Sequence, residues 1–407
     1  MRYLPNTPKD RQEMLKVIGK PSVDALFADI PEKIKLKKEI PLPPALSEPE
    51  LLAEMEAAAH SLSSSSSFLG AGVYHHFIPS VVKHIVSRSE FYTAYTPYQA
   101  EMSQGALQAI YEYQTMIARI TGMDAANASM YDGATAVAEA AFLACRVTGR
   151  KEIVVSDSLH PEHIKVLKTY AKGAALVVSE KETNNPACFI IQQPDFFGRI
   201  QDVSALAAKV HAKGALFIVS ADPISLGILK APGDYGADIV VGEGLSLGNP
   251  PSFGGPGLGI FAVKDKYIRQ IPGRVVGRTV DADGKPGFCL TLQTREQHIR
   301  RERATSNICS NEALAALAAV VYLSVMGKAG LKKVGELCLQ KTNYLKEKLR
   351  SRLVFPKAYN FKDLAVKTEI PVGLDLSRFY PEMKGARLIS ITELTAKEKM
   401  DELAALL

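Results

Sequence analysis

The stretch ADIVVGEGLSLGNPPSFGGPGLGIFAV, residues 237–263, decides the predicted fold of this chain. Two apolar segments, Ile239–Val241 and Leu258–Val263, are predicted strands, and a turn rich in glycine and proline joins them. The glycines at 254, 255, 257 and 259 predict a bend in which the backbone closely approaches another group. Predicted strands and helices alternate upstream of this stretch. That alternation indicates a mostly parallel sheet with helices on both faces.

The elements that surround this stretch support an α/β fold. The predicted strands upstream are Glu152–Val155, Ala175–Val178, Cys188–Gln192 and Ala215–Ser220, and the predicted helices there are Leu107–Ile120, Ala134–Val147, Pro161–Tyr170 and Val203–Lys213. Downstream, the predicted helices are Glu312–Met326, Val334–Leu349 and Ala396–Leu407, with short strands before the last. We therefore expect a helical N-terminal arm over residues 1–60, a large α/β domain over 61–325 and a small α+β domain over 326–407.

The arm contains two predicted helices, Arg11–Ile18 and Glu48–Ala59, separated by a proline-rich segment that denies a regular helix. The serine patch at residues 61–67 favours a flexible loop.

Composition narrows the class of protein. Of 407 residues, 47% are hydrophobic and 23% charged, which excludes fibrous and wholly disordered chains. The net charge of +6 has no long basic run behind it, so nucleic acid is not an expected partner. Five widely spaced cysteines predict no disulfide framework, and the apolar run Leu314–Met326 is too short to span a membrane. Because the N-terminus lacks an apolar signal, we expect a cytoplasmic protein.

Two short motifs lie where a ligand would bind in such a sheet. Gly133 and Thr135 follow Asp132 at the start of a predicted helix, where free N–H groups bind a phosphate or carboxylate. Asp132 could instead be only the helix cap. Asp222 follows the strand in LFIVSADPISL, residues 216–226. Its carboxylate could hold a protonated ring nitrogen, as pyridoxal phosphate enzymes require, or could simply cap the next turn.

The nucleophile expected with such a site is missing. In pyridoxal phosphate enzymes of the aspartate aminotransferase type, the Schiff-base lysine lies in a connection like residues 237–263. No lysine occurs between Lys230 and Lys264. The pattern thus favours a pyridoxal phosphate fold that lacks the amine its chemistry needs.

Two further clusters have competing interpretations. His160 and His163 are three residues apart but lack nearby carboxylate or cysteine partners, so we expect no metal site. QTREQHIRRERATSNIC, residues 293–309, gathers arginines ahead of Thr305 and Asn307. If this segment is a helix, Arg300 and Arg303 share a face that could bind an anion, whereas Arg301 points elsewhere. The alternative is a solvated helix face.

Three long stretches resemble a known family. They are FLGAGVYHHFIPSVV (68–82), SEFYTAYTPYQAEMSQGALQAIYEYQTMIARITGMDAANASMYDGATA (89–136) and QTREQHIRRERATSNICSNEAL (293–314). These stretches are similar to glycine decarboxylase, the P-protein of the glycine cleavage system, in its N-terminal half or separate alpha subunit. The similarity extends from residue 14 to residue 393, which is essentially the whole chain.

The resemblance implies a type I pyridoxal phosphate fold and a reaction. Glycine loses carbon dioxide on pyridoxal phosphate, and its aminomethyl group passes to the lipoyl arm of the H-protein. In this family the cofactor and its lysine belong to the beta subunit. Leu245 corresponds to that lysine, so the pocket near Gly133, Thr135, His160, Asp222 and Leu245 is expected to be degenerate. We expect an α₂β₂ assembly.

The same resemblance suggests how this chain contributes to the activity. Tyr95, Thr96, Tyr98 and Gln104 are the candidates for a wall of the partner's active site, where hydroxyls could orient glycine or exclude water. His75, His76, Arg300, Arg303, Thr305 and Asn307 are the candidates for the interface or for anion binding. One alternative is a scaffold that only stabilises the beta subunit and docks the H-protein. Another is an independent pyridoxal phosphate enzyme that uses a displaced lysine.

Overall fold

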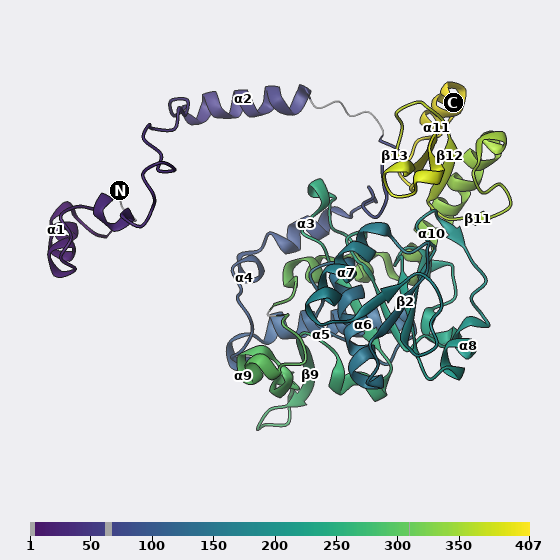
Figure 1. Cartoon of the computed structure of the whole chain (residues 1–407), viewed down its shortest axis with the longest axis horizontal. Helices are drawn as coiled ribbons and strands as arrows, with labels where there is room; N and C mark the ends of the chain where they lie inside the picture. The colour runs from purple at the N-terminus through teal and green to yellow at the C-terminus, as the bar shows by residue number, and fades with distance from the viewer. Residues whose placement is uncertain (1–4, 62–66, 309) are drawn as a thin grey trace. The chain divides into compact units, whose positions relative to one another are not determined.

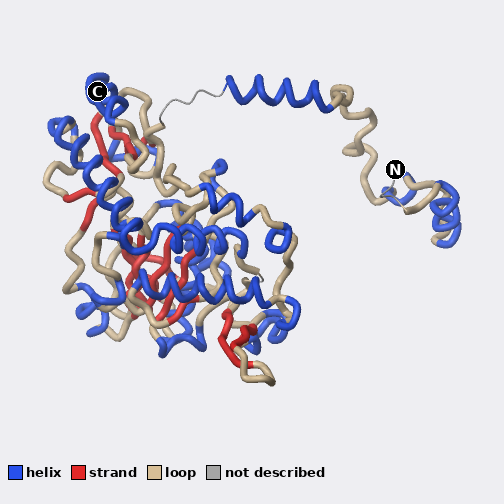
Figure 2. Tube along the Cα trace, turned by 180° about the vertical axis from the view of Figure 1, so that it is seen from behind, coloured by secondary structure: helices blue, strands red, loops and turns tan. Residues whose placement is uncertain are grey.

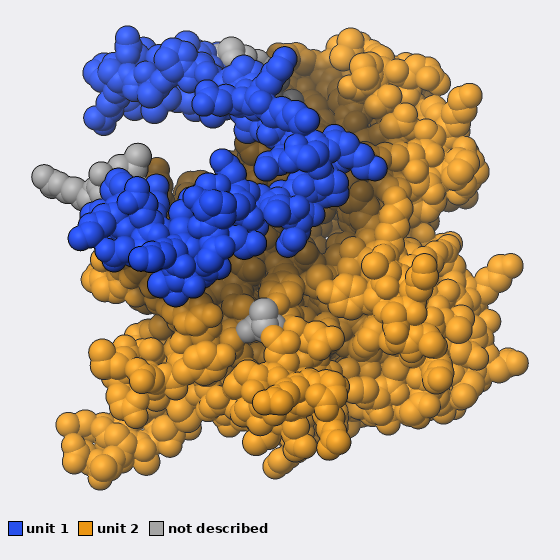
Figure 3. All heavy atoms as spheres, turned by 60° about the vertical axis from the view of Figure 1, so that its left-hand side comes forward, with its two compact units in different colours: residues 1–65 blue, residues 66–407 orange. Residues whose placement is uncertain are grey.

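The computed structural model describes residues 5–61, 67–308 and 310–407, which form two compact units, 1–65 and 66–407 (Figures 1 and 3). The first unit holds the two predicted helices, α1 (Pro8–Val17) and α2 (Glu48–Ser61). A capping box starts α1, because the Thr7 side chain accepts from Asp10 N–H at 3.2 Å. None of its described side chains is buried. Most of the predicted serine-rich loop lies outside the described residues.

The second unit is built around a seven-stranded sheet with the order β1-β8-β7-β6-β4-β2-β3 (Figure 2). These strands are β1 (Ala125–Ala126), β2 (Glu152–Val155), β3 (Val177–Ser179), β4 (Pro186–Gln193), β6 (Leu216–Ala221), β7 (Ile239–Glu243) and β8 (Gly259–Val263). Strands β2, β3, β4, β6 and β7 run parallel to one another. The glycine-rich turn reverses the chain, so β8 is antiparallel to β7, and β1 is antiparallel to β8. The predicted α/β class with a mostly parallel sheet is confirmed.

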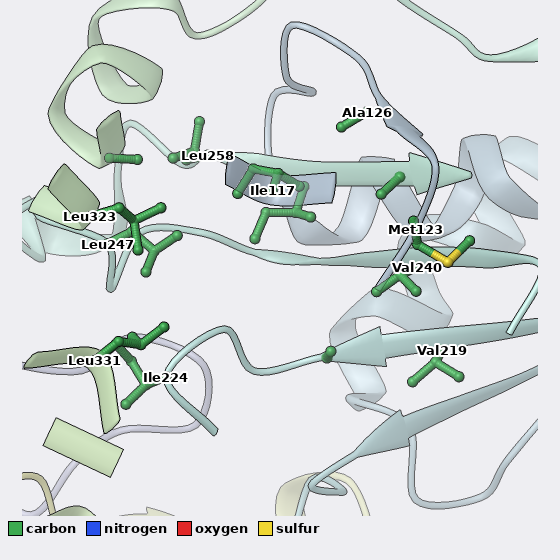
Figure 4. Close-up of a cluster of buried hydrophobic side chains, with 14 of the residues drawn as sticks. Ile117, Met123, Ala126, Val219, Ile224, Val240, Leu247, Leu258, Leu323 and Leu331 are labelled. Atoms are coloured by element: carbon green, nitrogen blue, oxygen red, sulfur yellow. The ribbon is translucent and has the colours of Figure 1, made fainter. Parts of the chain in front are cut away.

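Helices cover both faces of this sheet because its strands are apolar on both sides. Phe217 and Val219 of β6 pack into one core with α5, α8 and α10, part of which Figure 4 shows. Their neighbours Leu216 and Ile218 point to the opposite face and pack with α6 and α7. The helices of this unit are α3 (Ser80–Val86), α4 (Ser89–Tyr92), α5 (Gln104–Thr121), α6 (Gly133–Thr148), α7 (Pro161–Gly173), α8 (Leu206–Ala212), α9 (Gln297–Arg300), α10 (Ala313–Lys348) and α11 (Lys397–Leu406).

The two long helices predicted near the C-terminus form one element, α10, with a non-helical residue inside it at Gly327. By length and composition α10 could cross a membrane, but half of its most apolar window is buried in the protein. Tyr322 and Leu323 lie in the core shown in Figure 4. This burial favours a core helix of a soluble protein.

The remaining strands form three small sheets. The hairpin of β9 (Val275–Val280) and β10 (Pro286–Thr291) was not predicted from the sequence. In the C-terminal part, β12 (Asp363–Lys367), β13 (Leu374–Asp375) and β14 (Ala386–Ser390) form an antiparallel sheet. Strand β11 (Tyr359–Asn360) pairs with β5 (Arg199–Ile200), which follows β4 of the large sheet along the chain. The three-part domain division made from the sequence stays a prediction.

Candidate functional site

A cavity of about 320 Å³ lies where the parallel strands end. In an open α/β sheet, this edge is where ligands bind. Its lining includes the ends of β4, β6 and β7 and the starts of α6 and α7. The polar residues around it are Tyr74, Asp132, His160, Glu162, His163, Gln192, Ser220, Asp222, Glu243, Ser246 and Lys362. The cavity therefore brings together Asp222, His160 and Leu245, and it adjoins Gly133 and Thr135, as expected for the degenerate pocket.

A carboxylate occupies the start of α6. Gly133 N–H donates to Glu243 Oε2 at 2.9 Å, and Glu243 Oε1 accepts from the N–H groups of Leu245 (2.9 Å) and Leu258 (2.8 Å). Thr135 N–H donates to Asp132 Oδ1 at 2.7 Å, so Asp132 is the helix cap. Burial raises the pKa of the Glu243 carboxyl, which the three amide hydrogen bonds partly offset. The amides predicted to bind an external anion thus bind two carboxylates of the chain itself.

Asp222 also has partners within the chain. Its Oδ2 lies 2.5 Å from Lys362 Nζ, and its Oδ1 accepts from Ile224 N–H at 2.9 Å. The Lys362 side chain is only 1% exposed, and the Asp222 side chain is 19% exposed. Lys362 reaches this place from the turn between β11 and β12, and its Nζ lies 3.8 Å from the centre of the Tyr74 ring. The attraction of a cation to an aromatic face adds to the ion pair.

A buried hydrogen-bonded network continues from Lys362. His76 Nε2 lies 3.3 Å from Lys362 Nζ, and His76 Nδ1 lies 2.7 Å from Glu393 Oε2. These distances fit a neutral His76 that donates to Glu393 and accepts from Lys362. Burial and the nearby Lys362 lower the pKa of His76. Burial alone would raise the pKa of Glu393, but its hydrogen bonds prevail and lower it to about 2.

Three groups of this network could in principle hold a metal ion. The ligand atoms of His76, Cys338 and Glu393 lie within 4.8 Å of one another. However, Glu393 Oε1 already accepts from Phe77 N–H at 2.6 Å, and its Oε2 is paired with His76. The Lys362 ammonium beside His76 also opposes a further cation. We therefore interpret the cluster as a hydrogen-bonded network.

The two histidines at the start of α7 lie against each other. The rings of His160 and His163 stack with their centres 4.6 Å apart, and His160 also meets Phe196 edge to face. His160 Nε2 lies 2.8 Å from the Ala71 carbonyl oxygen. Burial, together with the His160 ring, lowers the pKa of His163 to about 3, and burial also lowers the pKa of His160. Both rings are therefore neutral at pH 7 and give this cavity an uncharged wall.

The aromatic segment that precedes α5 forms a separate depression of about 180 Å³. Tyr95 and Thr96 line it, and the Tyr95 side chain is 86% exposed. Tyr98 is outside its lining, and its hydroxyl accepts from Arg274 Nη2 at 3.3 Å. Gln104 is engaged by the hairpin, because its amide donates to Phe288 O and accepts from Phe288 N–H, both at 2.9 Å. Tyr95 and Thr96 are thus available to a partner, whereas the Gln104 side chain binds the backbone of the hairpin.

The two neighbouring histidines of this region differ in position. His75 is exposed, whereas His76 is buried in the network around Glu393. His76 therefore does not face an interface, contrary to what the sequence suggested. Because successive residues of an extended segment point to opposite sides, only one of the pair can face outward.

The arginine cluster is not one helix. Helix α9 ends at Arg300, and Arg301 has a φ of +53°, so Arg300 and Arg303 do not share a helical face as predicted. Arg300 Nε donates to the Thr294 carbonyl at 2.9 Å, and the exposed Arg303 lies 3.8 Å from Glu302. Thr305 and Asn307 line another cavity, of about 570 Å³, beside α6.

Comparison with known proteins now decides the family. All of residues 1–407 match the family model described as glycine cleavage system P-protein. This chain belongs to that P-protein family. The protein named probable glycine dehydrogenase (decarboxylating) subunit 1 from Desulforamulus reducens is 50% identical over 440 residues, covering 100% of this chain and 99% of that protein. A protein of the same name from Geobacillus kaustophilus is also 50% identical, covering 98% of this chain and 97% of its own length.

Solved structures agree with this P-protein assignment. The crystal structure of glycine decarboxylase (P-protein) of the glycine cleavage system, in inhibitor-bound form, has a TM-score of 0.84 and 41% identity, covering 100% of this chain and 99% of that one. A cysteine desulfurase from Thermococcus onnurineus has a TM-score of 0.58 at 14% identity, covering 84% and 93%, and shares the fold alone. The fold is therefore the type I pyridoxal phosphate fold, as predicted.

The cavity of this P-protein chain does not fit pyridoxal phosphate. Leu245, an apolar residue, lines the cavity, Glu243 accepts from Gly133 N–H at the start of α6, and Asp222 is paired with Lys362. Sequence reasoning identified Asp222 and Leu245 but missed Glu243 and Lys362. Glu243 could have been noticed as a carboxylate at the end of an otherwise apolar strand. Lys362 carried no local signal, since only the fold brings it to the cavity.

Proposed function

We propose that this chain is the alpha-type subunit, subunit 1, of glycine dehydrogenase (decarboxylating). Together with a beta subunit that carries pyridoxal phosphate, it decarboxylates glycine and transfers the aminomethyl group to the lipoyl arm of the H-protein. The observation that carries this proposal is the full-length match, at about 50% identity, to proteins named subunit 1. The lack of a lysine between Lys230 and Lys264 supports it, because a chain without an amine at the expected position needs a partner for the chemistry. We further propose an α₂β₂ assembly in the cytoplasm.

Within this complex, the exposed aromatic segment before α5 is proposed to form a wall of the partner's active site. Tyr95 and Thr96 present hydroxyls at the edge of a depression, and the 86% exposure of Tyr95 leaves it accessible to a partner. Their proposed role is to orient glycine's carboxylate and to exclude water from the reacting carbon. Tyr98 supports the segment through Arg274. The outward-facing His75, Arg300, Arg303, Thr305 and Asn307 are proposed to contact the beta subunit or an anion at its surface.

The second candidate is a scaffold whose residues enter no active site. The net charge of +6 favours one part of it, because a mildly basic chain could steer an acidic carrier protein such as H-protein. Its other part, stabilisation of the beta subunit, needs only a matching surface.

The function is tested by reconstitution. The purified chain alone is expected to show no exchange of the glycine carboxyl group with carbon dioxide, and addition of the beta subunit should produce that exchange. The physical reason is the absence of a lysine between Lys230 and Lys264 at the expected position of the amine. Exchange by the chain alone, or none with the beta subunit and H-protein present, would contradict the proposal.

Removal of the Tyr95 hydroxyl distinguishes a chain that lines the partner's active site from one that acts only as a scaffold. Tyr95→Phe in the reconstituted complex is expected to lower kcat by about tenfold, since one charge-assisted hydrogen bond contributes roughly 1.5–3 kcal/mol. The affinity of the two subunits should change little, because the ring remains. Tyr359→Phe is the matched control, as Tyr359 is 79% exposed and lies on β11. Equal kcat values for both variants would favour the scaffold.

A further inference from the structure

The cavity at the strand ends has the two features by which a type I fold holds pyridoxal phosphate, and both are engaged by the chain itself. One is the start of α6, whose N–H groups suit a phosphate. The other is Asp222 at the end of β6, whose carboxylate suits a protonated ring nitrogen. We propose that Glu243 and Lys362 are internal substitutes for the cofactor, with the Glu243 carboxylate replacing its phosphate and the Lys362 ammonium replacing its ring nitrogen. This inference concerns the chain's own cavity and goes beyond its proposed role at the partner's site.

The evidence at the phosphate end is the hydrogen bonding of Glu243. Its two oxygens accept three backbone N–H groups, among them Gly133 N–H at 2.9 Å. Asp132 takes Thr135 N–H at 2.7 Å, so the helix start has carboxylates as its partners. A phosphate that entered here would lose these donors and would meet like charge at short range. The helix start is thus satisfied in the way a phosphate would satisfy it.

The evidence at the ring end is the ion pair of Lys362. Its Nζ lies 2.5 Å from Asp222 Oδ2, and Ile224 N–H donates to the other oxygen. A pyridine nitrogen could bind Asp222 only by displacing an ammonium that is 1% exposed. The aromatic face of Tyr74 and the acceptor nitrogen of His76 would then lose their contacts as well. The ion pair therefore connects the turn between β11 and β12 to the end of β6. In the proposal, the Lys362 ammonium takes the place beside Asp222 that the ring nitrogen of the cofactor would take.

Lys362 also bears on the possibility of a displaced Schiff-base lysine. Among the residues described as lining this cavity, it is the one that carries a primary amine. A Schiff base on Lys362 would convert the ammonium group that contacts Asp222 into an imine nitrogen bound to the cofactor, and Asp222 would lose that ammonium as its partner. The same amine cannot hold both the carboxylate and the aldehyde of the cofactor. We infer that Lys362 is an internal ligand and not a nucleophile.

The proposal is tested by introducing a lysine at position 245, either with Glu243 in place or with Glu243 replaced by glutamine. The full-length chain is compared as Leu245→Lys and as Leu245→Lys with Glu243→Gln, using pyridoxal phosphate as the probe. Binding is followed by the absorption of a lysine Schiff base and by borohydride trapping. Glutamine keeps the shape of Glu243 but removes its charge. When its carbonyl oxygen accepts from the N–H groups of Leu245 and Leu258, its NH2 group faces Gly133 N–H and cannot accept from it. The double variant is expected to bind pyridoxal phosphate at least tenfold more tightly than Leu245→Lys.

The control for charge alone is Leu245→Lys with Glu162→Gln. Glu162 lines the same cavity, whereas the N–H groups of Gly133 and Thr135 donate to Glu243 and Asp132. This control should bind as Leu245→Lys does. Equal affinity of Leu245→Lys with and without Glu243→Gln would overturn the proposal. So would borohydride trapping of pyridoxal phosphate on Lys362 of the unmodified chain, located by peptide mapping.

A second measurement needs no new lysine. Inorganic phosphate is titrated into Glu243→Gln and into the unmodified chain, and thermal unfolding is followed. Phosphate should raise the Tm of Glu243→Gln beyond a sulfate-free salt control of equal ionic strength and should leave the unmodified chain unchanged. A phosphate-dependent rise of the same size in both proteins would show that the helix start is open to anions and would overturn the proposal.

Discussion

Replacing Lys362 by methionine is expected to lower the free energy of unfolding by about 3 kcal/mol, because it leaves the Asp222 carboxylate without its ion-pair partner. Removing one partner of a buried pair costs about 3–5 kcal/mol, and the 19% exposure of Asp222 favours the lower end, since water can reach it. Methionine fills nearly the same space, so the loss reports charge and not a cavity. Urea unfolding of the full-length chain at pH 7 measures it.

A double-mutant cycle with Asp222→Asn isolates the ion pair. The double variant should recover at least half of the loss, because no unpaired buried charge remains. Lys332→Met is the matched control, since Lys332 is exposed and lies 3.6 Å from Glu336. That variant should stay within about 0.5 kcal/mol of the unmodified chain. Equal stability of Lys362→Met and Lys332→Met would contradict the role assigned to Lys362.

Much of the sheet could be predicted because its signals are local. The strand predicted at Glu152–Val155 has those bounds in the structure, and the others differ by a few residues. Short apolar runs between polar turns are typical of strands buried on both faces. The position of Asp222 at the cavity also followed from the sequence, because the carboxyl ends of parallel strands share one edge, whereas His160 and Leu245 were placed there by the family resemblance.

The direction of β8 and the hairpin β9–β10 depended on contacts that the sequence does not display locally. A glycine-rich connection permits either direction, and pairing with β7 and β1 selects the antiparallel one. The prediction of one helix through the arginine cluster was wrong for a different reason. Its composition allows a helix, but Arg301 adopts a φ of +53°, which ends α9 and separates Arg300 from Arg303.

Some residues of the candidate site could not be predicted because their partners lie far away in the sequence. Lys362 comes from a turn far along the chain from Asp222. The pairing of β11 with β5 and the hydrogen bonds of the Lys362 backbone to Thr342 and Ile391 hold that turn in place. The candidates for the partner's wall depend on a surface that this chain does not contain. Gln104 illustrates the difficulty, because its amide is used by the hairpin that the sequence did not reveal. Polar residue type alone could not separate Gln104 from Tyr95.

Replacing His163 by phenylalanine is expected to remove part of the acid sensitivity of the fold. Burial and the His160 ring lower the pKa of His163 from 6.5 to about 3. Between these values the unfolded chain binds a proton at this site and the folded chain does not. Stability is therefore present above pH 6.5 and is lost as the pH falls, by about 1.4 kcal/mol per unit for one proton. Phenylalanine keeps a ring beside His160 but does not titrate.

The quantity to compare is the difference in the free energy of unfolding between His163→Phe and the unmodified chain, because the other groups with shifted pKa values contribute equally to both proteins. These include His76, Glu393 and Asp363, the last with a pKa raised by burial to about 6. From pH 7 to pH 5 the free energy of unfolding of His163→Phe should rise relative to the unmodified chain by about 2 kcal/mol. His84→Gln is the control, since His84 is exposed on α3. The free energy of unfolding of this variant relative to the unmodified chain should not change between pH 7 and pH 5. A difference for His163→Phe that stays constant over this range would mean that His163 titrates normally in the folded chain, and the cavity wall would then be charged in mild acid.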